Sequence, residues 1–567
     1  MDILFDCMVV GSGSSGVQAA QTLVGRGART LMLDIGEEKD PYYSGLVPNM
    51  DFSTLRCQDN AQHTYFLGKD FSGVIDTWTG AKNRITPPLK FVERNTDKYF
   101  PKTSGTCEVN FMESAALGGL ANAWGCGAFT FSEKALRRTG LSVADIRAAY
   151  PEIACRIGVS GEPNSEGLAF NECIQPPLKI DRNMAIIRER YKKVAPRLNK
   201  QKCFLERTPL AVQHLPHPRR QSEDYKDLDF WDLEHSAAYR PPLTLQLLKR
   251  QPGFTFLSRQ QVLRFEEKPD EVCVHTYDLR EKRYRTFRAR RLILAASVIG
   301  TARIVAGSFP DAVSAFPIIS TPYFYMAMLN LGMMCRQNSL WKSSYSQLSL
   351  YIDSDFEKDF ILLNMYTYRS LLLSRLVREL NIGMKFGYET VRFVKDMLVV
   401  GGVHLPEKHH PGNQLEFLPN PTHPSGLKLK IDYQIDPTRY REAARRVRKA
   451  MLALHCVPVK KKILEPGSGK HYAGTLPFSD REKAFSLAPN GRLYGTRAVY
   501  VADASGFRYL SAKGPTFTIM AYAHTVADGL FRERATVLTN DRSLNADFGA
   551  ESAKEPVSVM AEKPSKR

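Results

Sequence analysis

Long apolar runs are missing from this sequence of 567 residues. No stretch reaches the roughly 18 to 20 consecutive apolar residues that a membrane-spanning helix needs. The first residues also lack a basic region followed by an apolar segment and a cleavage site, which is the pattern of a secretory signal. We therefore expect a cytoplasmic protein with no membrane-spanning helix.

Metal-type cysteine motifs and internal repeats are missing as well. None of the ten cysteines forms a C-x-x-C pair, and their spacing suggests neither zinc nor a cluster, so we expect buried thiols. His404, His409 and His410 lie close together, but interrupting prolines and irregular spacing argue against a metal site. With 567 residues and 43% hydrophobic content, the chain is expected to form two domains.

Acidic residues are fewer than basic residues in this chain. The chain has 59 acidic and 78 basic residues, which gives a net charge of +19. This excess favours an anionic partner, such as a phosphorylated or nucleotide-linked small molecule or an acidic lipid surface, although a merely soluble surface accounts for it equally well. The basic residues are scattered and no recognised binding module is present, so we do not expect nucleic acid to bind.

The most informative motif present is the turn Gly11–Gly16, with the pattern G-x-G-x-x-G. It follows the apolar segment Ile3–Val10, which is predicted as a buried parallel strand. It precedes a small-residue helix predicted over Val17–Gly25. A strand, a glycine-rich turn and a helix in this order are typical of dinucleotide-binding folds.

Each residue of the turn has a physical role in such a fold. Gly11 allows the tight turn, and Gly13 lets the backbone approach a pyrophosphate. Gly16 lets the helix pack closely on the strand. The N-terminus of the helix then faces the phosphates with free N–H groups, and Ser14 and Ser15 of the turn are further expected cofactor-binding residues.

A carboxylate follows at the expected distance. The second apolar strand, Thr30–Leu33, ends in Asp34, eighteen residues after Gly16. An acidic residue there is placed to accept hydrogen bonds from the ribose hydroxyls of an adenosine. The sequence therefore predicts a dinucleotide site.

Similar segments lie far along the chain. We predict strands over Phe254–Leu257, Val262–Glu266, Val272–Tyr277, Tyr284–Ala289, Arg291–Ala296 and Ala498–Val501, and a helix from about Thr516 to Arg532. Because the strand-to-small-residue segments are scattered, the nucleotide domain is predicted to be discontinuous. A substrate domain is then inserted between its pieces.

Several blocks share their order and spacing with one known family. Leu33–Gly36 is similar to the acid-x-Gly after the second strand, and Leu117–Gly125 is similar to a second glycine-rich box. Leu294–Arg303 is similar to the box that supports the adenosine half. The most specific blocks are His471–Thr475, Val501–Ser505 and Pro515–Ala521. By these blocks the chain resembles the glucose-methanol-choline (GMC) oxidoreductases, flavin enzymes that oxidise alcohols.

The resemblance implies an α/β fold with a Rossmann-like FAD-binding domain, discontinuous in sequence, over 1–155, 240–310 and 460–538. It implies an inserted α+β substrate domain, built on an antiparallel sheet, over 156–239 and 311–459. We expect a disordered tail over 539–567. Beyond the first turn and Asp34, the implied cofactor-binding residues are Gly118, Gly119, Asn122, Ala123, Val262, Ala296, Asp503, Ala504, Pro515 and Thr516.

The resemblance also implies a catalytic base. His471 matches the family's active-site histidine, which takes the hydroxyl proton or holds the alkoxide while a hydride passes to flavin N5. An imidazole suits this task because its ordinary pKa is about 6.5.

Two positions depart from the family pattern. Gly514 stands where His or Asn usually supplies a second polar group to the substrate hydroxyl. Lys513 or Ser511 is then a candidate for that contact. Ala123 stands where some sugar-oxidising relatives carry the histidine that bonds FAD, so non-covalent FAD is expected.

The substrate side is predicted to contain strands over Tyr323–Met334, Gln347–Ile352 and Phe360–Tyr366. Residues 368–400 are basic and amphipathic, with polar side chains at helical spacing. Such a segment can lie on an anionic inner membrane face, or it can form a helical pair packed against the protein.

The sequence therefore favours an FAD-dependent oxidoreductase that acts on a CH–OH group, with a sugar or sugar-bearing metabolite as the favoured substrate. Gly514 keeps a second function open, namely flavin-dependent double-bond reduction or a redox-neutral rearrangement. A third is a non-catalytic scaffold or assembly protein that is stabilised by FAD.

Overall fold

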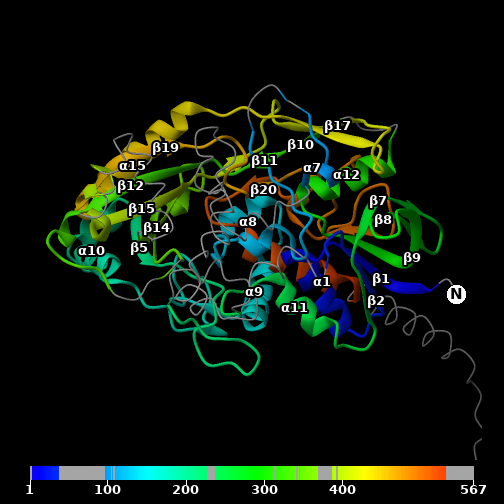
Figure 1. The fold of residues 1–567 in the computed structure, drawn as a ribbon, viewed down its shortest axis with the longest axis horizontal. Coiled ribbons are helices and arrows are strands. Elements are labelled where there is room, and N and C mark those ends of the chain that lie inside the picture. The colour runs from blue at the N-terminus through cyan, green and yellow to red at the C-terminus, as the bar shows by residue number, and fades with distance from the viewer. Residues whose placement is uncertain are drawn as a thin grey trace, which may run out of the picture.

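The structure is a computed structural model that describes residues 3–37, 96–103, 105, 109–225, 236–310, 315–339, 343, 345–367, 386–387, 389–390 and 394–531. Two large sheets lie toward opposite ends of the long axis (Figure 1). One has seven strands and the other has six. The chain has a mixed α/β fold, as the sequence predicts.

The seven-stranded sheet is built from the first, middle and late parts of the chain. Its strands are β1 (Leu4–Val10), β2 (Thr30–Leu33), β6 (Phe254–Leu257), β7 (Gln260–Glu267), β8 (Val272–Asp278), β9 (Arg283–Leu294) and β21 (Val499–Val501). The order is β6-β2-β1-β9-β8-β7, and β21 also pairs with β9. The pairs β6·β2, β2·β1, β1·β9 and β9·β21 are parallel, whereas β7, β8 and β9 form an antiparallel meander.

One strand differs from its prediction. The sequence predicts two strands over Tyr284–Ala289 and Arg291–Ala296, but β9 is a single strand from Arg283 to Leu294. Its first half pairs with β8, and its second half lies between β1 and β21. The strand is continuous because both halves find partners in the same sheet.

Helices around this sheet include α1 (Ser14–Gly25), α11 (Pro241–Leu248) and α12 (Val298–Ser308). A further helix covers 516–531. Two more helices, α8 (Glu133–Thr139) and α9 (Val143–Ile157), lie between the two sheets in the projection of Figure 1. The buried side chains of these helices and of the sheet form one large apolar core.

The six-stranded sheet is entirely antiparallel. Its order is β19-β12-β15-β14-β13-β5, with strands β5 (Cys203–Arg207), β12 (Tyr323–Asn330), β13 (Leu348–Ile352), β14 (Ile361–Thr367), β15 (Leu398–His404) and β19 (Cys456–Ile463). β12, β13 and β14 correspond to the three strands predicted from the sequence.

Side chains of β12 alternate between two environments. Phe324, Met326 and Met328 join a second apolar core with α10 (Arg182–Lys200) and α15 (Pro437–Ala453). Tyr323 and Tyr325, on the opposite face, line a cavity. This is the period-two pattern of a strand whose two faces meet different neighbours.

Short elements connect the two sheets. The three-stranded sheet of β10 (Ala315–Pro317), β17 (Gln414–Pro419) and β18 (Leu427–Asp432) packs its apolar residues into the first core. Two-stranded pairs join β11 (Ile319–Ser320) to β20 (Tyr472–Ala473), and β16 (Glu407–Lys408) to β22 (Tyr509–Leu510). These pairs bring the middle of the chain against its late segments.

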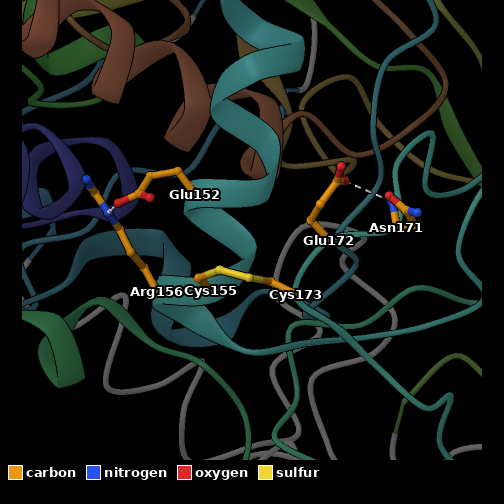
Figure 2. The surroundings of a disulfide bond; sticks show 6 residues. All are labelled: Glu152, Cys155, Arg156, Asn171, Glu172 and Cys173. Carbon is orange, nitrogen blue, oxygen red and sulfur yellow. Dashed lines mark hydrogen bonds and ion pairs between the residues drawn. A yellow bond between two sulfur atoms is a disulfide. The ribbon is translucent and has the colours of Figure 1, made fainter.

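The expectation of thiols throughout is wrong at two cysteines. Cys155 of α9 and Cys173 form a disulfide, which Figure 2 shows at the helix end, with Arg156 of the same helix paired to Glu152. Their Cα atoms are 5.2 Å apart, within the usual range for such a bond. Spacing alone could not pair these residues, because the loop returns to the helix only in the folded chain. Cys335 is also exposed rather than buried.

Two predicted regions lie wholly or mostly outside the described residues. The first is the amphipathic segment 368–400, of which only 386–387, 389–390 and 394–400 are described. The second is the tail 539–567. In the described part of the chain, no helix is both long and apolar enough to cross a membrane.

Candidate active site

The turn between β1 and α1 has the geometry that its glycines predict. Gly11 has φ +103°, and a β-carbon there would lie 2.4 Å from the carbonyl oxygen of Ala295. A β-carbon on Gly16 would lie 1.8 Å from the carbonyl oxygen of Gly11. A β-carbon on Gly13, by contrast, would have only one described atom within 4 Å, the carbonyl oxygen of Gly118 at 4.0 Å. The turn is therefore packed on its inner side and open where a ligand would approach.

Asp34 holds this turn in place. Its two carboxylate oxygens accept hydrogen bonds from the backbone N–H groups of Ser12 and Gly36, each at 2.6 Å. Burial raises the pKa of Asp34, while these hydrogen bonds act in the opposite direction. Asp34 also lines the cavity, so it can bind the turn and still present an oxygen to a ligand.

The second glycine-rich box lies directly against the first. The backbone N–H of Gly118 donates to the Ser12 hydroxyl at 3.0 Å, and Gly118 has φ +86°. The side-chain nitrogen of Asn122 donates to the carbonyl oxygens of Leu117 and Gly119. Asn122 thus stabilises the short helical turn η1 (Gly119–Ala123) from behind.

The segment after β21 is joined to this part of the fold through a buried carboxylate. Asp503, which follows β21, accepts hydrogen bonds from the hydroxyls of Thr301 and Ser505, each at 2.5 Å. Burial raises the pKa of Asp503, against the effect of these hydrogen bonds. Thr301 belongs to α12, so the contact ties the block after β21 to the block after β9.

These segments surround a cavity of about 700 Å³. Its lining includes most of the cofactor-binding residues predicted from the sequence, namely Gly11, Gly13, Ser14, Ser15, Asp34, Gly118, Gly119, Ala123, Val262, Ala296, Asp503, Ala504, Pro515 and Thr516. The predicted residues Gly16 and Asn122 lie behind this surface and position the backbone that forms it.

His471 stands at another part of the same cavity. Its side chain is half-buried, and no described residue is hydrogen-bonded to its Nδ1. Burial lowers the pKa of His471 to about 4, because the surrounding protein withdraws hydration from the charged form. The imidazole is therefore neutral at pH 7 and can accept a proton.

Gly514 lies beside this histidine. A β-carbon on Gly514 would be 3.6 Å from Cε1 and 3.7 Å from Nε2 of His471. The sequence offers Lys513 and Ser511 for the polar contact that Gly514 lacks, but neither is among the described residues that line the cavity. Lys513 Nζ donates to the carbonyl oxygen of Glu166, and Ser511 Oγ donates to Glu357 at 3.2 Å.

Sequence reasoning missed several polar residues of the cavity, among them His404 and Glu113. The sequence singles out His404 only in arguing against a metal site, but the residue lines the cavity with its ring stacked on that of His471. Glu113 and Arg303 also line the cavity and form a buried bidentate pair, at 2.6 and 2.9 Å. The position of His404 on the cavity face of an alternating strand is the signal that could have indicated it.

Comparison with known proteins agrees with this site. Residues 420–523 match the family profile described as GMC oxidoreductase. This carboxy-terminal segment is thus similar to GMC oxidoreductases, the family that the motifs predict. A comparison with curated proteins gave no match. Among solved structures, a pyridoxine 4-oxidase from Mesorbium loti matches with a TM-score of 0.55 and 11% identity, over 93% of this chain and 99% of that one.

The residues of this chain fit FAD, the cofactor that GMC oxidoreductases generally bind. The open approach at Gly13 suits the phosphates of a dinucleotide, and the carboxylate of Asp34 suits its ribose. The start of the helix over 516–531 suits the remaining length of the molecule. The cavity volume lies within the range of small-molecule sites. No cluster of three or more His, Cys, Asp or Glu side chains that could hold a metal is found within the described ranges.

Proposed function

We propose that this chain is an FAD-dependent oxidoreductase that oxidises a CH–OH group, with His471 as the base and a sugar or sugar-bearing metabolite as substrate. The observation that carries the proposal is the position of a neutral imidazole in the cavity that also contains the dinucleotide-binding turns. FAD, when bound, supplies the acceptor for the hydride from the carbinol carbon.

The side chains then have distinct tasks. His471 accepts the hydroxyl proton at Nε2, the nitrogen nearer Gly514. Tyr323, Tyr325 and Tyr366 give the cavity an aromatic wall that suits a ring-shaped substrate and excludes water. Ala123 presents only a methyl group, so FAD is bound without a covalent bond.

Anaerobic reduction of the bound FAD tests the proposal. Purified protein is mixed without oxygen with pyridoxine, benzyl alcohol, glucose, glucose 1-phosphate or UDP-glucose, and the flavin absorbance is followed. We expect at least one alcohol to bleach the flavin. His471→Asn should slow that reduction by about 10²- to 10⁴-fold with unchanged FAD content. His409→Asn, an exposed histidine near β15, is the matched control and should have no effect.

Other outcomes would favour the other functions. If no alcohol bleaches the flavin, but chemically reduced enzyme reduces an activated double bond, then double-bond reduction replaces alcohol oxidation. If His471→Ala retains FAD and leaves the cellular phenotype unchanged, the protein acts as a scaffold. Acid precipitation tests the cofactor bond, because non-covalent FAD will remain in the supernatant.

A further inference from the structure

The reacting end of the cavity has a polar group that the motifs do not predict. His404, the last residue of β15, lines the cavity together with His471. The centroids of the two imidazole rings are 5.4 Å apart, and the ring planes differ by 23°. The two histidines, 67 positions apart in the sequence, thus stand side by side, and Gly514, which provides no side chain, lies next to His471.

Backbone hydrogen bonds fix this pairing. The N–H of Thr321 donates to the carbonyl oxygen of His471 at 3.1 Å, and the N–H of Leu405 donates to the carbonyl oxygen of Pro322, also at 3.1 Å. Residues 321–322 therefore join the strand end that carries His404 to the segment that carries His471. The backbone positions from which the two rings project are thereby fixed relative to each other.

A tyrosine holds the second imidazole from its other side. The rings of Tyr323 and His404 are stacked with centroids 4.4 Å apart. A β-carbon on Gly402 would lie 2.7 Å from the Tyr323 hydroxyl oxygen, so the missing side chain at Gly402 leaves room for the tyrosine. Aromatic packing of this kind favours one plane for the imidazole ring.

The hydrogen-bonding capacity of both imidazoles is incompletely used. Within the described part of the chain, neither the Nδ1 of His404 nor that of His471 has a hydrogen-bond partner. Buried polar atoms without partners are uncommon because each costs free energy. Burial, above all, holds the pKa of His404 well below its ordinary value, and a proton on the neighbouring His471 would lower it further. Both rings are therefore neutral at pH 7. A neutral imidazole provides one N–H donor and one acceptor nitrogen.

We propose that His404 supplies the second polar contact to the substrate hydroxyl, in place of the side chain that Gly514 lacks. The inference rests on the proposed function and assigns the two imidazoles complementary tasks. His471 accepts the proton as the O–H bond breaks, and His404 donates an N–H hydrogen bond to the same oxygen as the carbonyl forms. The two electrons and the carbinol hydrogen leave as a hydride to FAD.

The first test measures hydroxyl binding directly and does not require turnover. The FAD-loaded full chain, with ¹³C-labelled histidine, is titrated with trifluoroethanol, an alcohol that is a poor hydride donor. The His404 and His471 resonances are assigned by their loss in His404→Asn and His471→Asn. We expect both resonances to shift along one saturation curve, while the His409 resonance stays in place. A shift of His471 alone, or of neither residue, would overturn the inference.

The second test is a rescue. His404→Ala should slow the anaerobic reduction of FAD by about a hundredfold with unchanged FAD content, because one hydrogen-bond donor to the reacting oxygen is lost. Adding Gly514→Asn to that variant should raise the rate of FAD reduction again by about tenfold. The β-carbon of the new side chain would lie at ordinary van der Waals distance from His471. If His404→Ala lowered the rate only by disturbing the structure, a polar side chain at position 514 would not restore the rate.

The outcomes separate this inference from the proposed function. If no alcohol reduces FAD in the wild type but both resonances shift, the proposed oxidation fails and the paired hydroxyl site stands. If alcohols reduce FAD and His404→Ala reacts at the wild-type rate, the proposed function stands and the role of His404 is refuted. His409→Ala should match the wild type in both tests.

Discussion

The two ends of the cavity are assembled in different ways. At the glycine-rich end, β1, the turn and α1 are continuous in sequence, and Asp34 closes the unit with two hydrogen bonds to nearby backbone. At the histidine end, His404 and His471 come from distant segments and are held by backbone contacts through residues 321–322. The first end is a local motif, and the second exists only in the folded chain.

This difference determines what a substitution does at each end. The glycine-rich end has backbone against backbone, so an added carbon has no flexible neighbour that could move aside. The histidine end has side chains facing a cavity, where a change can be accommodated locally. We therefore expect lost stability at the first end and lost reactivity at the second.

Gly16→Val should have the largest effect. Its β-carbon would lie 1.8 Å from the Gly11 carbonyl oxygen, so the turn and α1 must separate. We expect a loss of about 4 kcal/mol or more in the free energy of unfolding, with loss of FAD binding. Gly25→Ala is the matched control in the same helix, because a β-carbon there meets no described atom within 4 Å. Urea unfolding measures both, and equal stability of the two variants would contradict the contrast.

The histidine end should contribute to stability in a pH-dependent way. The pKa of His471 is about 4 in the folded chain and about 6.5 when unfolded, so only the unfolded chain binds this proton between those values. The contribution is complete above about pH 6.5 and is lost as the pH falls toward 4, on the order of 3 kcal/mol in total. Urea unfolding from pH 8 to 4 should show a shallower fall in His471→Asn than in the wild type. Parallel curves would mean that His471 titrates normally.

Asp34→Ala should have an intermediate effect at the glycine-rich end. It leaves the N–H groups of Ser12 and Gly36 without their carboxylate partner, and we expect a loss of about 2 kcal/mol in the free energy of unfolding. FAD affinity, measured by fluorescence titration, should fall as well. Asp270→Ala, at an exposed carboxylate between β7 and β8, should change stability by less than about 0.5 kcal/mol. If Asp34→Ala left the free energy of unfolding and the FAD affinity unchanged, the turn would be stable without these hydrogen bonds.

Gly402→Ala should have the smallest effect on stability. The added carbon meets the hydroxyl end of Tyr323, a flexible side chain that can shift, so we expect a loss of about 1 kcal/mol or less. FAD binding should be unchanged, whereas the rate of alcohol oxidation should fall as Tyr323 leaves His404. An unchanged rate would show that this stacking does not orient the imidazole.

Sequence patterns predicted the fold well where neighbours in sequence are neighbours in space. The strands around Gly11–Gly16 and Asp34 lie where periodicity places them, and β12 follows its alternating pattern. The predictions failed where the pairing partner is distant in sequence, as at β9. This strand is continuous because β8 pairs along its first half and β1 along its second half. The disulfide at Cys155 could not be predicted for the same reason.

By itself, the sequence determined the resemblance to GMC oxidoreductases, the glycine-rich turns and the carboxylates that face them, because glycine conformation and hydrogen bonding act over a few residues. It also identified Gly514 as a position without a polar side chain. Only the tertiary structure decided the contacts of the polar side chains: Lys513 and Ser511 bind other groups, while antiparallel pairing brings His404 to His471. Strand register and long-range backbone hydrogen bonds set that contact, and neither is encoded in a local motif.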